Sequence, residues 1–346
     1  MPLRKAYIEL TNKCNLDCTI CYRRSWNEKL MDMNLKVFEK IKKDIEDLET
    51  LKSVVIGGIG EPSFAPLIHD ALEVFGQYDL TLTTNAVTLN AALLESIVKH
   101  VNMIMVSIDG LEENYSKIRG INLKFILDNI NKINELKRLT GSTAPTVGIQ
   151  FVMSKDNIGD VFSLIDLADS LKVNMLVLSN LLPQTKENTN KILYKRYENT
   201  EIKHLFNKIL NYSMRRGITV LLPNCELKTE RRCSFVEDEA AFINVSGDIV
   251  PCYRLSHTYK EYVFGREKTV IGHSFGNVME KSLKDIWNSR EYSSFRQIVS
   301  GNRYPSCMDC DLVEGCDMVR DTASDCYAGS PSCADCLWTR KFTICP

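Results

Sequence analysis

Short runs rich in apolar and β-branched residues alternate with amphipathic segments along residues 5–222. In the amphipathic segments, apolar residues recur every three or four positions, which is the pattern of a helix with one buried face. The segments with this helical pattern are 37–48, 91–101, 123–133 and 161–171. The runs typical of strands are 5–10, 51–57, 79–84, 103–108, 147–153 and 173–179.

Continuous apolar strands joined by helices indicate a parallel sheet that is covered on both faces. Six such units favour an α/β fold built as a partial (β/α)6 TIM-like barrel, and a doubly wound open sheet is the alternative. In both folds the loops that follow the strands gather at one edge, where ligands bind. The residues after each strand are therefore the candidates for chemistry.

The rest of the pattern is less regular. The polar segment 184–197 is predicted to be a long surface loop, and 218–223 a last strand. A β-hairpin is predicted over 242–253, with its turn at Ser246, Gly247 and Asp248. A pair of helices that ends in a glycine is predicted over 282–301. We therefore expect helices and strands to become sparse after the barrel.

The composition is that of an ordinary soluble protein. The chain has 346 residues, of which 44% are hydrophobic and 25% charged, and its formal net charge is −1. This charge gives no reason to expect a nucleic acid or an anionic membrane as a partner. No apolar run approaches the roughly 20 residues of a membrane span, and the N-terminus leads directly into a strand pattern. We therefore predict a cytoplasmic protein.

The cysteines are unusual in number and place. Of 13 cysteines, three lie near the N-terminus and all others lie between Cys225 and Cys345. Disulfides seldom persist in the cytoplasm, so metal binding explains this clustering better. We predict a barrel domain over 1–222 and a cysteine-rich domain over 223–346, which bound metal would stabilise because it is too small to bury a large core.

Cys14, Cys18 and Cys21 have the spacing Cys-x3-Cys-x2-Cys on the loop after the first strand. Three thiolates can hold three irons of a four-iron, four-sulfur cluster and leave the fourth iron open. The alternative is a zinc site completed by a distant histidine. The five histidines, none of which lies in this loop, are His69, His100, His204, His257 and His273.

The stretch CNLDCTICY, with Tyr22 directly after the last cysteine, resembles the radical S-adenosylmethionine (SAM) enzymes. The resemblance implies that the amino and carboxylate groups of SAM bind the open iron. It also implies that one electron, from a donor such as a ferredoxin or flavodoxin, cleaves SAM to a 5′-deoxyadenosyl radical that abstracts a hydrogen atom. The chemistry would then belong to the cofactors, with the protein supplying position and exclusion of water.

Polar residues after the later strands support this resemblance. The stretch GGIGEP (57–62) looks like the family's glycine-rich motif, in which Glu61 would accept the methionine ammonium group. The residues that the resemblance places on SAM are Tyr22, Gly60, Glu61, Pro62, Asn85, Ser107, Asp109, Arg119, Gln150 and Asn180. Arg119 would pair with a carboxylate, and Gln150 and Asn180 would contact ribose and adenine. Singly, such residues are more often turn signals or surface charges; their recurrence at successive strand ends favours a site.

The later cysteines resemble the SPASM extension of radical SAM enzymes, which implies two auxiliary 4Fe–4S clusters. Cys233 is followed by 13 residues, Gly247, four residues and Cys252, and then by Cys307-x2-Cys310-x5-Cys316. By this match Cys225, Cys233 and Cys252 belong to the first cluster, and Cys307, Cys310 and Cys316 to the second. Arg320 stands where the pattern expects another cysteine, so the remaining ligands must come from Cys326, Cys333, Cys336 and Cys345.

Two alternatives stay open for this domain. A first auxiliary cluster with an open iron would imply direct substrate binding. A zinc ribbon at CMDC (307–310) or CADC (333–336) would also fit the short spacings.

The stretches CYRRSW (21–26) and 325–346 resemble maturases associated with tungsten-cofactor oxidoreductases of the aldehyde:ferredoxin type. This implies a radical step on the cofactor or polypeptide of such an enzyme, which would be the partner. Alternatives are a maturase that installs a thioether or crosslink in a ribosomal peptide and a formylglycine maturase of sulfatases. From another class, a non-enzymatic iron–sulfur carrier or scaffold would explain the cysteines but not the polar strand ends. No residue is identified as a base for the substrate.

Overall fold

The computed structural model describes residues 1–344. In this range the main sheet has nine strands in the order β7-β6-β5-β4-β3-β2-β1-β8-β9. The strands are β1 (Lys5–Ile8), β2 (Ser53–Ile56), β3 (Asp79–Thr84), β4 (Met103–Ser107), β5 (Thr146–Met153), β6 (Met175–Asn180), β7 (Thr219–Leu221), β8 (Ala240–Ile243) and β9 (Ile249–Val250). They match the predicted strands, with small shifts at the ends.

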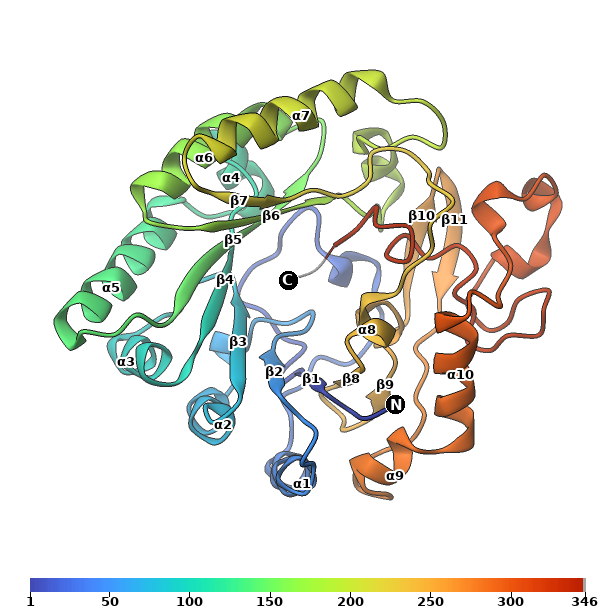
Figure 1. The fold of residues 1–346 in the computed structure, drawn as a ribbon, viewed down its shortest axis with the longest axis horizontal. Coiled ribbons are helices and arrows are strands. Elements are labelled where there is room, and N and C mark those ends of the chain that lie inside the picture. The colour runs from blue at the N-terminus through green and yellow to red at the C-terminus, as the bar shows by residue number, and fades with distance from the viewer. Residues whose placement is uncertain (345–346) are drawn as a thin grey trace.

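The first seven strands lie side by side in the order in which they occur along the chain. Each strand from β1 to β7 pairs in parallel with the next along the chain. Figure 1 shows the sheet curved like an open barrel, with α1, α2, α3, α5, α6 and α7 on its outer side. A doubly wound sheet would reverse its strand order and carry helices on both faces. The prediction of a partial barrel is therefore confirmed, and the doubly wound alternative is wrong.

The helices between the strands bury the apolar stripes seen in the sequence. They are α1 (Leu35–Glu46), α2 (Ile68–Phe75), α3 (Ala91–His100), α4 (Glu112–Arg119), α5 (Lys124–Thr140), α6 (Val161–Ser170) and α7 (Thr200–Met214). In α1, for example, Val37, Ile41 and Ile45 are buried, and the side chain of Asn34 caps the first turn. The helix α5 extends beyond the predicted 123–133 because the polar residues after 133 continue it to a left-handed glycine at Gly141.

The C-terminal part is attached to the barrel by a strand. The predicted hairpin over 242–253 is confirmed as β8 and β9, and β8 pairs in parallel with β1. The helical pair over 282–301 is also confirmed, as α9 (Leu283–Trp287) and α10 (Arg290–Ser300). The remaining elements are α8 (Ser234–Glu237) and the antiparallel pair β10 (Tyr259–Val263) and β11 (Arg266–Val270). The domain boundary at 222 stays a prediction, since β8 extends the barrel sheet.

The segment 184–197 differs from the expected solvated loop. Gln184, Asn188 and Tyr194 are buried, and Asn188 donates a hydrogen bond to the carbonyl of Thr19 in the cysteine loop at 3.1 Å. The polar composition was misleading because Asn188 satisfies a backbone carbonyl instead of facing water, and because Gln184 and Tyr194 are enclosed by the fold. The segment packs against the cysteine loop.

The described C-terminal segment lies at the C-terminal ends of the barrel strands, where Thr343 and Ile344 line a cavity. The amide of Ile344 donates to the hydroxyl of Ser179 at 3.0 Å, and the Asn180 side chain donates to the carbonyl of Phe342 at 3.0 Å. Residues 342–344, the last that the structure describes, therefore contribute to the edge of the sheet where ligands are expected. Among residues 1–344, no helix combines the length and apolarity that crossing a bilayer would need.

Candidate active site and auxiliary metal centres

A cavity of about 240 Å³ lies at the C-terminal ends of the barrel strands. The cysteine loop, the loops after β2, β3 and β4, and the ends of β5 and β6 all contribute to its wall. The predicted residues that line it are Cys14, Cys18, Cys21, Tyr22, Gly60, Glu61, Asn85, Ser107, Asp109, Arg119, Gln150 and Asn180. Pro62 is buried behind the wall, where it begins a short 3-10 turn. The structure thus gathers residues that lie far apart in the sequence, while the role of each stays a prediction.

The cysteine loop is held in place by backbone contacts. Thr19 donates its amide hydrogen to the carbonyl of Ile118 at 2.9 Å, and the Arg24 guanidinium donates to the carbonyl of Cys18 at 2.8 Å. Burial raises the pKa of Cys14 and raises that of Cys18 to about 11. In the absence of a metal these thiols are therefore neutral, and metal binding would release their protons.

Glu61 is a buried carboxyl group at the cavity wall. Its oxygens accept hydrogen bonds from the amides of Ser63 and Asn85 at 3.0 and 2.6 Å, and from the Ser63 hydroxyl at 2.6 Å. Burial raises its pKa despite these donors. An ammonium group bound in the cavity would offset this burial and favour the carboxylate. The position fits the role predicted from the glycine-rich motif.

Asp109 and Arg119 pair with each other at the next part of the wall. The Arg119 Nε donates to the Asp109 carboxylate at 2.8 Å, and Asp109 also accepts from the amide of Val152 at 2.8 Å. Asp109 is wholly buried. The carboxylate partner that was predicted for Arg119 is therefore supplied by the protein in this structure. The guanidinium also lies near Cys18.

Two features of the cavity fit a polar ligand in contact with the backbone. The side-chain oxygens of Asn180 and Thr343 line the cavity and, within the described chain, are buried without a hydrogen-bond partner. A Cβ at Gly60 would lie 2.1 Å from the carbonyl oxygen of Thr11 and 2.6 Å from that of Lys13. Only glycine lets this loop approach the cysteine loop so closely. These residues fit a group such as SAM between the glycine-rich loop and β6.

Four cysteines from the C-terminal part line a second, smaller cavity. They are Cys233, Cys252, Cys333 and Cys336. Burial raises the pKa of each of these thiols, that of Cys233 to about 12. The pKa values of Cys233, Cys252 and Cys333 are raised further by other thiols of the set, which shows that these groups lie close together. Four converging thiols are the ligand set of one cluster. The sequence alone did not show that Cys233 and Cys252 share a cluster with Cys333 and Cys336.

A third group of cysteines surrounds the turns that follow α10. Burial raises the pKa of Cys307 to about 12, and Cys326 and Cys316 lie near enough to add to that shift. Cys310 follows in the same turn, where its amide donates to the carbonyl of Cys307 at 3.4 Å. Cys310 and Cys326 are exposed at the surface. The placement of this set agrees with the second predicted cluster and adds Cys326 to it.

The structure does not bring Cys225 to either group. Its thiol is buried beside Glu226 and near Lys203, and its carbonyl accepts from the amide of Lys195 at 3.0 Å. The sequence match that grouped Cys225 with Cys233 and Cys252 rests on order along the chain, whereas Cys225 does not line the cavity that Cys233 and Cys252 share. Cys345 lies outside the described residues.

Within residues 1–344, no three His, Cys, Asp or Glu side chains stand close enough together to hold a single metal ion. The cysteines of a four-iron cluster each bind a different iron. They therefore stand farther apart than the ligands of one zinc ion, whose sulfur atoms lie about 2.3 Å from the metal.

Several buried charged residues next to the auxiliary cysteines were not predicted from the sequence. Asp335, wholly buried between Cys333 and Cys336, pairs with Lys268 at 2.8 Å and with Arg266 at 2.9 Å. Arg254, which lines the four-cysteine cavity, is also buried and pairs with Glu261. Such residues have the sequence signature of surface charges, so only their burial reveals them.

Comparisons with known proteins agree with the family expectations. The model of the radical SAM superfamily matches residues 8–168, and that of SPASM, an iron–sulfur cluster-binding domain, matches residues 233–311. The tungsten-containing aldehyde ferredoxin oxidoreductase cofactor-modifying protein of Pyrococcus furiosus is 38% identical over 350 residues, which cover 99% of this chain and 97% of that protein. A probable GTP 3′,8-cyclase of Pyrococcus abyssi is 26% identical over 54% of this chain and 60% of its own length.

Solved structures show the same fold. SuiB of Streptococcus suis bound to SAM has a TM-score of 0.63 at 19% identity, over 92% of this chain and 72% of SuiB. The structure of anSMEcpe with bound SAM has a TM-score of 0.62 at 15% identity, over 98% of this chain and 96% of that one. The family models and the Pyrococcus furiosus relative confirm the resemblances to radical SAM enzymes and to SPASM domains, and the solved structures confirm the fold.

Proposed function

This chain belongs to the radical SAM superfamily and has a SPASM domain, and we propose that it modifies the cofactor of a tungsten-containing oxidoreductase. The observation that carries this proposal is the similarity to the Pyrococcus furiosus cofactor-modifying protein, which extends over nearly the full length of both chains. Because the match includes the cysteine-rich part as well as the barrel, it supports a shared substrate class. The solved peptide- and SAM-bound relatives support only the fold.

The protein is a SAM-dependent enzyme that uses a 4Fe–4S cluster, and its SPASM domain binds auxiliary iron–sulfur clusters. When bound, the reduced cluster and SAM supply a 5′-deoxyadenosyl radical that abstracts a hydrogen atom. A non-enzymatic iron–sulfur carrier or scaffold would not need the polar cavity at the strand ends. The radical SAM family and the cofactor-modifying relative confirm the enzyme prediction over that alternative.

In this proposal, Cys14, Cys18 and Cys21 hold the first cluster at the cavity. The Glu61 carboxylate receives the ammonium group of SAM, and the amides of Ser63 and Asn85 keep that carboxylate in place. The side-chain oxygens of Asn180 and Thr343, which have no hydrogen-bond partner among residues 1–344, accept hydrogen bonds from the adenosine part. The apolar part of the wall, which excludes water from the reacting atoms, is formed by Ile20, Tyr22, Leu181, Leu182, Trp338 and Ile344.

The auxiliary clusters also receive complete ligand sets in this proposal. One is held by Cys233, Cys252, Cys333 and Cys336, and the other by Cys307, Cys310, Cys316 and Cys326. Because four thiols converge on the first site, it has no open iron, and the substrate must bind elsewhere. The cavity at the strand ends is the place we assign to it.

The experiment uses the anaerobically reconstituted enzyme with dithionite, SAM and a tungsten-containing aldehyde ferredoxin oxidoreductase produced without its modifying protein. We expect the oxidoreductase to increase 5′-deoxyadenosine formation and the mass of its extracted cofactor to change. A sulfatase and an unrelated metalloprotein serve as controls. Equal 5′-deoxyadenosine formation with all three proteins and an unchanged cofactor mass would refute the proposed substrate. A ferredoxin or flavodoxin in place of dithionite tests the predicted electron donor.

A further inference from the structure

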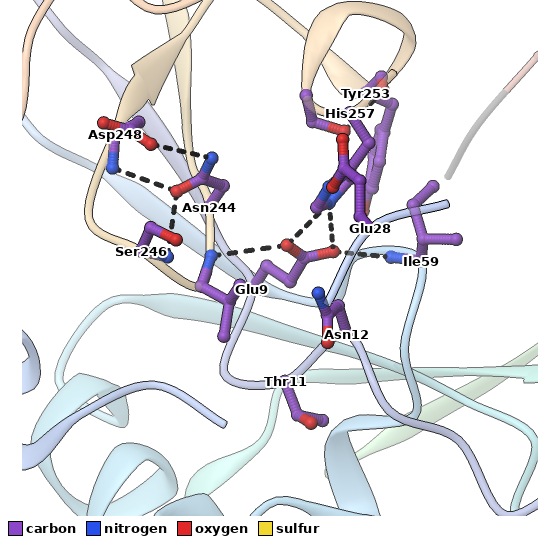
Figure 2. Close-up of polar contacts among 12 residues, drawn as sticks. Glu9, Thr11, Asn12, Glu28, Ile59, Asn244, Ser246, Asp248, Tyr253 and His257 are labelled. Carbon is purple, nitrogen blue, oxygen red and sulfur yellow. Dashed lines mark hydrogen bonds and ion pairs between the residues drawn. The ribbon is translucent and has the colours of Figure 1, made fainter. Parts of the chain in front are cut away.

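Outside the cavity, a histidine lies between two carboxyl groups, one of which contacts the backbone of the glycine-rich loop. Figure 2 shows His257 between Glu9 and Glu28. Its Nε2 lies 2.9 Å from one Glu9 oxygen, and its Nδ1 lies 2.6 Å from a Glu28 oxygen. Ionised carboxylates only accept hydrogen bonds, so both ring nitrogens must donate. His257 is therefore an imidazolium ion in this arrangement.

The three residues come from three segments with different roles. Glu9 directly follows β1, Glu28 lies beyond the cysteine loop, and His257 follows the proposed cluster ligand Cys252. The Trp26 ring packs on the imidazole with centroids 4.3 Å apart. The bridge thus joins the barrel, the exit of the cysteine loop and the auxiliary segment.

At its inner end the bridge reaches the loop proposed to bind SAM. Glu9, which is wholly buried, accepts a hydrogen bond from the amide of Ile59 at 3.0 Å (Figure 2). A Cβ at Gly58, whose φ is +132°, would lie 2.6 Å from Cγ of Glu9. The Glu9 side chain therefore fixes both the position and the backbone conformation of this loop, and Gly58 and Ile59 line the cavity.

At its outer end the bridge holds the auxiliary segment. The second oxygen of Glu28 accepts from the amide of Thr258 at 2.7 Å, so Glu28 contacts both the ring and the backbone of this segment. Glu9 also accepts from the amide of Val245, in the turn between β8 and β9, at 3.3 Å. Removal of the imidazolium would leave two facing carboxylates, one of them buried, without a cation.

We propose that His257 is a positioning residue that couples the auxiliary-cluster segment to the SAM-binding loop, so that SAM binds tightly only when the Cys252 segment is folded. The inference rests on the proposed functions of the glycine-rich loop and of Cys252. It assigns to the Glu9–His257–Glu28 bridge a role in cofactor affinity and none in the chemical step.

The charge of His257 depends on the two carboxylates. Burial alone would lower its pKa, but hydrogen bonds and charge interactions with Glu28 and Glu9 raise the pKa to about 9. The charged groups that face it are Glu9 from the end of β1 and Glu28 from beyond the cysteine loop. The Trp26 ring packs on the imidazole. Because this pKa is raised, His257 stays charged in the folded protein at neutral pH. The stabilisation that the bridge contributes is full below the ordinary histidine pKa and is lost as the pH rises through about 9.

The test measures the SAM dissociation constant of the full-length, anaerobically reconstituted protein by equilibrium dialysis. His257→Gln is expected to weaken SAM binding at least about tenfold at neutral pH, because the buried Glu9 loses its cation. The matched control is His273→Gln, in which the altered ring packs on Phe275 at 4.8 Å, and it should bind SAM as the parent does. Unchanged binding by His257→Gln would overturn the proposal.

A double-mutant cycle tests the coupling itself. Cys252→Ala should weaken SAM binding in the parent but add little in the His257→Gln background, since the connection is already broken. Additive effects would contradict the coupling. If the parent protein binds no SAM when it is fully loaded with iron, the proposed function itself is wrong. This result differs from both additive and non-additive effects in the cycle, which require that the parent binds SAM.

Glu28→Gln provides a second variant that folds even if His257→Gln does not, because Glu28 is partly exposed. It removes one of the two carboxylates that hold the proton on His257. The alkaline loss of SAM affinity, expected near pH 9 in the parent, should therefore move to lower pH. The same pH profile in both proteins would contradict the proposal.

Discussion

The rings of Tyr22 and Trp338 lie 6.3 Å apart between centroids, where the cofactor cavity meets the four-cysteine cavity. Tyr22 follows the last cysteine of the N-terminal loop, and Trp338 follows Cys336 by two residues. Trp338 lines both cavities, so a single indole forms part of the wall between them. The proposed radical site and the first auxiliary cluster are therefore neighbours.

This shared wall predicts an effect on oxygen sensitivity. Trp338→Ala should admit water and oxygen to the first auxiliary cluster, whereas Trp338→Phe should keep most of the apolar wall. Measured in a Cys14→Ala, Cys18→Ala, Cys21→Ala background, the iron–sulfur absorbance in air should decay several-fold faster with alanine than with phenylalanine. Equal decay rates in the two variants would show that Trp338 does not shield the cluster.

The ligand sets predict the iron content of single-cysteine variants. Cys333→Ala and Cys336→Ala should each lose up to about four iron atoms per chain, the content of one cluster. Cys225→Ala should keep the full iron content, because Cys225 lies away from both groups. Iron assay with electron paramagnetic resonance of the reduced proteins distinguishes these cases. Loss of a cluster from Cys225→Ala would restore the assignment made from sequence order.

The fit of the glycine-rich loop predicts a steric effect on SAM binding. In Gly60→Ala the new Cβ would lie 2.1 Å from the carbonyl oxygen of Thr11, so the loop must move away from the cysteine loop. We expect SAM affinity to fall at least about tenfold, since a shift of this size disrupts the hydrogen bonds of bound cofactor. Gly159→Ala is the matched control, because the Cβ that alanine adds there would meet no described atom within 4 Å apart from those of the adjoining backbone and its chain neighbours. Equal SAM dissociation constants for the two variants would contradict the assigned role of the loop.

The buried charges beside the auxiliary cysteines predict a large stability effect. Asp335→Asn should destabilise the reconstituted protein by about 3–5 kcal/mol, because Lys268 and Arg266 lose their buried partner. Asp317→Asn breaks the exposed pair with Arg320 and should change stability by less than about 1 kcal/mol. Anaerobic denaturant unfolding measures both. Similar decreases in the free energy of unfolding in the two variants would mean that the buried ion pairs of Asp335 stabilise the protein no more than the exposed pair does.

Much of the barrel could be predicted because apolar residues recur at regular spacings along its helices and strands. The stripe of Val37, Ile41 and Ile45 faces the core of α1, and the polar residues after successive strands meet at one cavity because the strands are parallel. The three N-terminal cysteines were found for the same reason, since they lie on one loop at that edge. Local spacing and sheet geometry were sufficient there.

The C-terminal part could not be assembled from the sequence. Its loops have no regular spacing of apolar residues. The sequence around each cysteine therefore gives no sign that Cys233 and Cys252 lie beside Cys333 and Cys336. The pairing of β8 with β1 and the bridge through His257 join segments far apart in the chain. Such contacts depend on the whole fold, and a buried ionic residue has the same sequence signature as a solvated one.

In the proposed function, SAM is cleaved by a radical route in the cavity beside Cys14, Cys18 and Cys21. The most direct measurement is 5′-deoxyadenosine formation by the anaerobically reconstituted enzyme with dithionite, SAM and the unmodified tungsten oxidoreductase. The parent should form this product, and the Cys14→Ala, Cys18→Ala, Cys21→Ala variant should form none while it keeps the iron of both auxiliary clusters. Product from that variant, or none from the fully loaded and reduced parent, would contradict the account.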